Sequence, residues 1–206
     1  MSQIALPLLW PADDAIGDFI LSATNVDAVR HLEHRALWPV MTTVLTGPRK
    51  SGRSLLGRIF VAESGGILID DADRRDEESL FHAWNAAQSD RRPLLLIADR
   101  PPPIWQVTLP DLRSRLAATP AVAIGDPDDA LAAALLEKLL GARGLLLSPP
   151  VAAYILTRMD RSHVAIGRLV DALDAAALVR QQGLTIPLAR KALRACGFID
   201  ESQEIG

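Results

Sequence analysis

The residues best suited to chemistry lie between positions 47 and 54. They read Gly-Pro-Arg-Lys-Ser-Gly-Arg-Ser, which has the spacing Gly-x-x-x-x-Gly-basic-Ser of a phosphate-binding loop, or P-loop. Glycines let backbone amides turn toward phosphate oxygens, and the start of a following helix adds positive potential. The hydroxyl of Ser54 would hold Mg²⁺. The pattern predicts a site for nucleotide phosphates, and a glycine-rich surface turn is the alternative.

One residue of this loop departs from the usual pattern. Arg53 stands where lysine is usual, and its planar guanidinium does not reproduce a compact ammonium. We therefore expect phosphate binding, with weak or no ATP hydrolysis by the chain itself. Solvent-facing loop charges are the alternative for Arg49 and Lys50. The predicted cofactor-binding residues of the loop are Gly47, Pro48, Arg49, Lys50, Ser51, Gly52, Arg53 and Ser54.

Acidic residues follow the next apolar runs of the chain. Asp70 and Asp71 come directly after residues 67–69, and Asp99 follows residues 94–98. An acid at the end of a neighbouring strand can hold Mg²⁺, which we predict for Asp70, and the next acid can polarise the attacking water, which we predict for Asp71. Asp99 falls where a polar residue would contact the terminal phosphate. The alternative is that these aspartates cap the structures that follow the strands.

These residues require a sheet whose strand ends meet at one edge. Apolar runs predict the strands, and stretches with helical periodicity separate them, which favours a parallel sheet with crossover helices. The predicted strands cover residues 40–45, 67–69, 94–98 and 121–124. The predicted helices of this part cover residues 26–36, 55–62, 77–88 and 111–116. Asn25 is the predicted N-cap of the first of them.

After Gly125 the pattern becomes helical throughout. The predicted helices cover residues 130–140, 149–158, 163–182 and 186–197. Asp126, Ser162 and Thr185 are predicted N-caps, and Pro127 is predicted at a first helical position. The fold class is therefore α/β with an all-helical C-terminal part. The predicted divisions are an extended N-terminal tail at 1–10, a P-loop base at 11–125 and a helical lid at 126–206.

Composition excludes several classes of protein. The chain has 206 residues, of which 49% are hydrophobic and 23% charged, unlike a disordered or fibrous protein. Its single cysteine, Cys196, rules out an internal disulfide and a cysteine-based zinc site. A net charge of −3 argues against a protein that coats nucleic acid. Since we find no signal peptide and no apolar stretch of about 18 residues, we expect a cytoplasmic protein with no membrane partner.

Several segments resemble the AAA+ module of the bacterial replication initiator DnaA. They are Phe19, Asn25 and Ala28 on the adenine side, residues 68–71 as the acid strand, residues 98–101 as sensor 1, and residues 109–116 as the arginine-finger segment. The Gly-Arg-Ser ending of the P-loop and the Leu-Pro-Asp-Leu before the finger resemble the DnaA-related Hda family. The resemblance implies an AAA+ P-loop parallel-sheet base, short of one edge strand, with a C-terminal all-helical lid.

The resemblance also implies a function. In the Hda family the protein, with ADP bound and docked on the DNA-loaded sliding clamp, stimulates ATP hydrolysis by DnaA and so prevents re-initiation. It implies ADP, or ATP, as cofactor, with Asn25 and Asp99 among the contacts. Arg115 becomes a finger acting in trans on a nucleotide held by DnaA, and a surface salt bridge is its alternative. The partners are DnaA and the clamp, with DNA reached only through the clamp and a homodimer left open.

The first residues of the chain resemble the family's clamp-binding motif. An extended segment with a Gln amide and apolar side chains suits peptide capture in an apolar pocket. The predicted partner-binding residues are Gln3, Ile4, Leu6, Pro7 and Leu8. An apolar tail without a partner is the alternative.

Some features depart from the family pattern. The chain has no room for an additional strand and helix before residue 65, and the lid arginine called sensor 2 is absent from its expected place at Val164 or Ala165. Arg161 and Arg168 are the candidate substitutes. The rival functions are a self-sufficient P-loop ATPase and an AAA+-like adaptor that has lost nucleotide. The histidines, expected to be surface or hydrogen-bonded helix residues, are His31, His34, His82 and His163.

Overall fold

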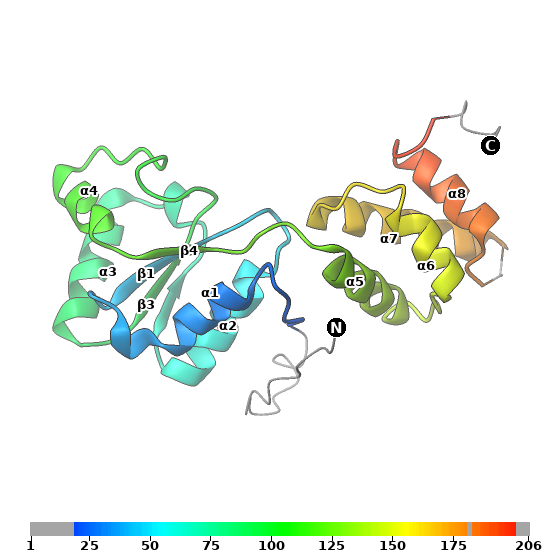
Figure 1. Cartoon of the computed structure of the whole chain (residues 1–206). Coiled ribbons are helices and arrows are strands. Elements are labelled where there is room, and N and C mark those ends of the chain that lie inside the picture. Colours follow the sequence, from blue (N-terminus) through cyan, green and yellow to red (C-terminus); the bar gives the residue numbers. More distant parts are fainter. Residues whose placement is uncertain (1–18, 181–182, 201–206) are drawn as a thin grey trace.

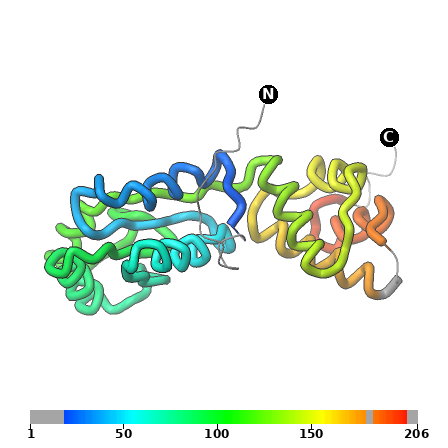
Figure 2. The backbone as a smooth tube through the Cα atoms, turned by 90° about the horizontal axis from the view of Figure 1, so that it is seen from below, coloured from blue at the N-terminus to red at the C-terminus, as the bar shows by residue number. Residues whose placement is uncertain are grey.

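The chain folds into two lobes that lie side by side along an elongated molecule (Figures 1 and 2). The structure is a computed structural model, and it describes residues 19–180 and 183–200. One lobe, the base, contains the sheet, and the other, the lid, contains only helices (Figure 1). The predicted tail at 1–10 lies outside the described residues.

A four-stranded parallel sheet forms the centre of the base. Its order is β2-β3-β1-β4. The strands are β1 (Thr42–Thr46), β2 (Ile67–Ile69), β3 (Leu94–Ile97) and β4 (Ala121–Ala123). Val44 of β1 lies opposite Leu96 of β3 on one side and Ala121 of β4 on the other. This confirms the predicted α/β fold with a reduced parallel sheet, in which the carboxyl ends of the strands share one edge.

Helices cover both faces of this sheet (Figure 1). They are α1 (Val26–Glu33), α2 (Arg53–Ser64), α3 (Glu77–Ser89) and α4 (Pro110–Ala117), with short 3₁₀ turns η1 (Arg35–Leu37) and η2 (Ala72–Arg74). Leu45 and Leu95 pack with α1 and α2, whereas Val44 and Leu96 pack with α3 and α4. The strands have no polar alternation because both faces of the sheet are buried.

The lid consists of four helices with a core of their own. They are α5 (Asp129–Gly141), α6 (Pro149–Leu156), α7 (His163–Arg180) and α8 (Ile186–Ala195). Its fully buried side chains include Leu136, Leu140, Ile155, Leu169, Val170, Leu173 and Leu193. The base clusters extend to Ile124 and the lid cluster begins at Ala132. The division of the chain at residues 11–125 and 126–206 stays a prediction.

The N-caps of the lid agree with the sequence except at α5. Ser162 Oγ accepts a hydrogen bond from the Ala165 amide at 3.1 Å, and Thr185 Oγ1 accepts one from the Leu188 amide at 3.4 Å. The prediction of Asp126 as a cap is wrong, because Asp128 accepts the Leu131 amide at 2.7 Å and α5 begins two residues beyond Pro127.

A helix that spans a bilayer needs about 20 mostly apolar residues. Within residues 19–180 and 183–200, no helix is long and apolar enough to span one.

Candidate nucleotide site

The P-loop joins β1 to α2 on the side of the base that faces the lid (Figure 1). Gly47 has φ of +154°, and a Cβ there would lie 2.9 Å from the Ile124 carbonyl oxygen at the end of β4. Gly52 has φ of +88°, and a Cβ there would lie 3.2 Å from the Phe19 ring. Glycine is needed at both places because the backbone is left-handed and its neighbours approach closely. The loop therefore has the tight geometry that the sequence pattern predicts.

Ser51 supplies a second indication of a ligand in this loop. The residue is 6% exposed, and its hydroxyl oxygen has no hydrogen-bond partner among the described residues. Its amide donates to the Pro48 carbonyl at 3.2 Å, which closes the turn. A buried hydroxyl without a partner is uncommon, since the great majority of such groups are hydrogen-bonded. The orphan hydroxyl and the glycine cradle fit a phosphate group.

Arg53, at the end of the P-loop, forms an ion pair with Asp99. Arg53 donates to the Ala98 carbonyl at 2.6 Å and to Asp99 Oδ1 at 2.9 Å. Arg74 donates to Asp99 Oδ2 at 2.7 Å. The hydrogen bond from Arg53 is the main cause that lowers the pKa of Asp99, with the charges of Arg53, Arg74 and Arg49 acting in the same direction. Asp99 is thus an ionised partner of the basic loop residue rather than a helix cap.

The structure gives less support to the predicted metal residues. Asp70 Oδ1 accepts the amide of Asp71 at 2.9 Å, and Asp71 is exposed with φ of +52°. Asp70 also lines a cavity of about 450 Å³ together with Leu68 and Ser79. No hydrogen bond joins either acid to Ser54 or the rest of the loop in the described chain. Nor do the described residues contain a group of at least three His, Cys, Asp or Glu that could hold a metal ion.

Asn25 lies at the junction between base and lid. Its side chain accepts the Ser22 amide at 2.9 Å and donates to the Ile20 carbonyl at 2.8 Å. The Thr24 carbonyl beside it accepts the amide of Gly125, the residue that leads to the lid, at 2.8 Å. Asn25 begins α1 without a side-chain capping bond, and its amide instead holds the turn of residues 20–25. This turn places Phe19 against the P-loop.

The first turns of α7 face the P-loop and the segment that connects the lobes. A Cβ added to Gly167 would lie 3.6 Å from Lys50 Nζ. His163, on the same face of the helix, is close to Gly125 and Asp126. Both candidate substitutes for sensor 2 have other contacts: Arg161 forms an ion pair with Asp129 and Arg168 donates to the Cys196 carbonyl at 3.4 Å.

His163 has a hydrogen bond with the Gly125 backbone, as expected of a hydrogen-bonded helix residue, but its Nε2 differs. The residue is 8% exposed, and this nitrogen has no hydrogen-bond partner among the described residues. Burial lowers the pKa of His163, and the Gly125 backbone and the Asp126 carboxylate offset this only in part. Nothing in the local sequence signals its burial, because the position follows a helix start of ordinary polarity. The packing of lid on base decides it.

Arg115, the predicted finger, lies against its own α3. Its guanidinium carbon is 4.3 Å from the centre of the Phe81 ring and 5.4 Å from that of Trp84. Nε donates to Asn85 Oδ1 at 2.9 Å and Nη1 donates to the Asp111 carbonyl at 3.2 Å. Within the described chain, Nη2 has no hydrogen-bond partner. These contacts hold the guanidinium in place against α3 and leave Nη2 available to a neighbouring molecule.

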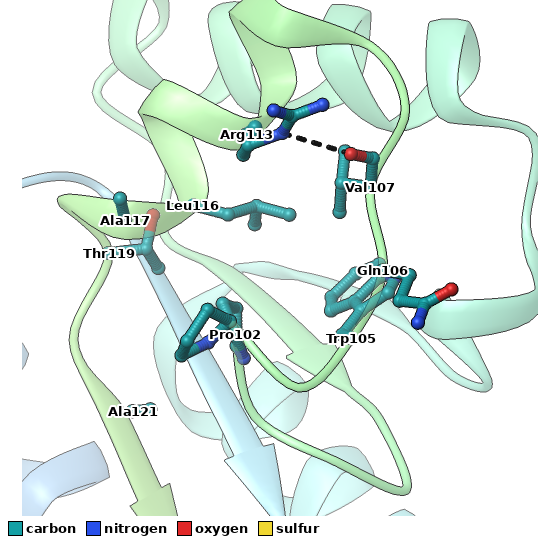
Figure 3. A pocket seen from close by; sticks show the side chains of 10 residues that line it. Pro102, Trp105, Gln106, Val107, Arg113, Leu116, Ala117, Thr119 and Ala121 are labelled. Atoms are coloured by element: carbon teal, nitrogen blue, oxygen red, sulfur yellow. Dashed lines mark hydrogen bonds between the residues drawn. The ribbon is translucent and has the colours of Figure 1, made fainter.

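A mainly apolar cavity of about 460 Å³ lies beside α4, the helix that carries Arg115 (Figure 3). Trp105 and Pro102 line it from the loop after β3, and Leu116 lines it from α4. Arg113 borders it and donates to the Val107 carbonyl at 3.0 Å (Figure 3). The cavity shares no lining residue with the P-loop. The neighbour of the finger, Arg113, is therefore a structural residue of this loop.

Comparisons with known proteins agree with this architecture. Residues 128–193 match the family described as Hda, lid domain. An uncharacterized protein of Haemophilus influenzae is 34% identical over 118 residues, which are 57% of this chain and 51% of that protein. The chain thus spans about half the length of this curated relative.

Solved structures share the fold at low sequence identity. Domain III of the replication initiation protein DnaA from Thermotoga maritima has a TM-score of 0.70 at 14% identity, over 86% of this chain and 94% of that one. AMPPCP-bound DnaA from Aquifex aeolicus has a TM-score of 0.63 at 15% identity, over 86% of this chain and 67% of that one. Residues 128–193 thus resemble the Hda lid domain, and most of the chain shares the fold of DnaA domain III.

Proposed function

We propose that this protein is an Hda-like regulator of replication initiation. With ADP in its P-loop and docked on the sliding clamp, it promotes ATP hydrolysis by DnaA and so prevents re-initiation. The observation that carries this proposal is the match of residues 128–193 to the Hda lid domain. The P-loop that opens toward this lid and the seated Arg115 are consistent with it.

The charges around the P-loop favour a diphosphate over a triphosphate. The backbone amides of the loop would hold phosphate oxygens, and the Ser51 hydroxyl would gain a partner. The Asp99 carboxylate lies 2.9 Å from Arg53, so it neutralises the side chain that would otherwise meet a terminal phosphate. A further negative charge at that point is repelled. Mg²⁺, if bound with the nucleotide, would be held by Ser54 and Asp70.

Arg115 performs the chemical role in this proposal. A guanidinium placed beside the terminal phosphate of a nucleotide held by DnaA stabilises the charge that develops on the transferring group. The contacts with Phe81 and Asn85 fix the side chain, and in this proposal Nη2 would donate to the partner's phosphate. Asp71 stays a prediction as a water-polarising acid, since it makes no described contact with the loop.

A reconstituted assay tests this role. Arg115→Ala should reduce the stimulation of DnaA ATP hydrolysis by about 10³-fold or more, which is the usual worth of such a residue. Arg115→Lys keeps the charge without the planar fork and should recover little of it. Arg58→Ala, an exposed arginine of α2, is the charge-matched control. Wild-type stimulation by the Arg115→Ala protein would contradict the proposal.

One observation favours a second candidate function, a nucleotide-free adaptor. The Arg53–Asp99 pair already neutralises the basic residue of the loop without a ligand. If the pair replaces the nucleotide permanently, purified protein will contain no nucleotide and ADP will not raise its melting temperature. Co-purified ADP, or a thermal shift on adding it, excludes the adaptor.

A further inference from the structure

Lys50 has an unusual position between the P-loop and the lid. In the part of the chain that the structure describes, it is one of three residues other than glycine with positive φ, at +63°, a conformation that lysine adopts rarely. Such backbone outliers persist where the surroundings require them, and they cluster at functional sites. The lysine side chain reaches across to the other lobe.

The Lys50 side chain ends against α7. A methyl group on Gly167 would lie 3.6 Å from Nζ and 4.0 Å from Cδ. The helix thus has no side chain at the one place where the ammonium rests. Within the described residues, Lys50 forms no ion pair or hydrogen bond, so its charge has no protein partner.

The other cations near this junction have partners elsewhere. Arg53 is bound to Ala98 and Asp99, and Arg49 acts electrostatically on Asp99. In the lid, Arg161 is paired with Asp129 and Arg168 reaches the Cys196 carbonyl. Among the described residues of the loop, Lys50 is a cation that approaches the lid closely, at Gly167.

From these observations we propose that Lys50 couples the lid to the bound nucleotide. Its ammonium binds a phosphate oxygen of a nucleoside diphosphate while its stem stays on Gly167, so that nucleotide occupancy fixes the position of α7. The cation that links the nucleotide to the lid is thus a lysine of the P-loop and not an arginine of the lid. This inference rests on the nucleotide binding of the proposed function and is independent of the action of Arg115 on DnaA.

The test combines ADP affinity with the position of the lid. Calorimetry gives the affinity of the full chain for ADP. Spin labels on Ala62→Cys of α2 and Lys191→Cys of α8, with Cys196→Ser, give the distance between the lobes with and without ADP. All three positions carry exposed or half-exposed side chains, so the fold is retained.

Lys50→Met keeps the stem and removes the charge. It should weaken ADP binding about tenfold, the loss expected for a charge-assisted hydrogen bond. In the wild type, ADP should narrow the distribution of distances between the two spin labels. In Lys50→Met, ADP should leave this distribution as broad as it is without ADP. Lys50→Arg should restore the narrowing. Arg58→Met, with the same loss of charge on α2, should behave as the wild type. ADP affinity within about twofold of wild type in Lys50→Met, with unchanged narrowing, overturns the proposal.

Substitutions of Gly167 test the lid half of the contact. Gly167→Ala places its methyl at ordinary contact distance from Nζ and should be neutral. Gly167→Leu should displace the ammonium and reproduce the Lys50→Met result with the lysine still present. A loss of affinity in Lys50→Met but not in Gly167→Leu overturns the coupling. If the wild type does not bind ADP, both this proposal and the ADP-binding part of the proposed function are overturned. The Arg115 assay then tests separately whether the protein stimulates ATP hydrolysis by DnaA.

Discussion

At the scale of single residues, Arg53 and Asp99 set the charge that a nucleotide in the P-loop would meet. An arginine held by a carboxylate and a carbonyl does not reach freely for a terminal phosphate, as a mobile lysine would. The left-handed backbone conformation of Lys50 destabilises the folded state by about 1–2 kcal/mol, and other contacts of the fold offset this. On the proposed function, the local chemistry of the loop would therefore favour retention of a bound nucleotide over its hydrolysis.

Asp99→Asn tests this assignment of charge. The neutral amide keeps the size of the side chain but removes the repulsion of a terminal phosphate, so affinity for ATP should rise relative to ADP. Calorimetry with both nucleotides gives the ratio. The wild type should prefer ADP, and a wild-type preference for ATP of tenfold, about 1.4 kcal/mol, would contradict the charge argument. Asp73→Asn, beside the same strand end, is the matched control because Asp73 binds the Asp99 amide and no arginine of the loop.

His163 links stability to pH. Burial lowers the pKa of His163 below its usual value near 6.5, and His31 is shifted in the same direction by burial. Below pH 6.5 the unfolded chain binds protons that the folded chain does not, so the free energy of unfolding falls as the pH drops from about 7 to 5.5. Urea unfolding at each pH measures the slope. His163→Gln should flatten this slope, and an unchanged slope in that variant would contradict the assignment to His163.

At the scale of elements, each helix is positioned by contacts at its ends as well as by its apolar face. Glu77 at the start of α3 accepts the Thr108 amide at 2.9 Å and the Leu109 amide at 2.6 Å, which ties α3 to the start of α4. These bonds lower the pKa of Glu77. The segment that carries Arg115 is thereby fixed to the helix that seats its guanidinium.

The start of α5 provides an element-scale prediction. Asp128→Ala removes the side chain that accepts the Leu131 amide and should reduce the free energy of unfolding by about 1 kcal/mol, the usual worth of an N-cap. Chemical denaturation measures this loss. Asp126→Ala, at the position predicted from sequence as the cap, should change stability by less than about 0.5 kcal/mol. Equal losses in the two variants would show that the cap is not what Asp128 contributes.

At the scale of the whole molecule, two lobes with separate cores meet beside the P-loop. The sheet presents its carboxyl edge and the P-loop toward the lid, and α7 presents Gly167 toward Lys50. Ligands in open α/β folds bind beyond the carboxyl ends of the strands. A nucleotide here would contact both lobes, so its presence would bear on their relative position.

The predicted clamp contact also concerns the whole molecule. Replacing Gln3, Leu6 and Leu8 by Ala should abolish binding to the sliding clamp, because the amide and the apolar anchors are removed together. Since the sequence predicts an extended tail there, the free energy of unfolding should change by no more than about 0.5 kcal/mol. Surface plasmon resonance on immobilised clamp, with thermal unfolding as the check on folding, gives both values. Unchanged clamp affinity would refute the tail as the binding segment.

Much of the fold could be predicted because its signals are local. Buried strands without polar alternation, glycine and proline at element ends, and helical periodicity place the elements within a few residues of those observed, as for 77–88 against α3 (Glu77–Ser89). The P-loop prediction rests on the same kind of local signal, since the spacing of its residues lies within a single loop. The cap of α5 was missed because two aspartates flank the same proline and only the helix register selects between them.

The contacts that define the site were beyond the sequence because they join distant segments. Arg53 meets Asp99 across 46 positions of the chain, and Arg115 meets Asn85 across 30. Lys50 meets Gly167, and His163 becomes buried, only because the lid packs beside the base. A residue's type and spacing state what chemistry it can do. Its partner, its burial and hence its charge depend on which other segment the fold brings within a few ångströms, and no local pattern encodes that.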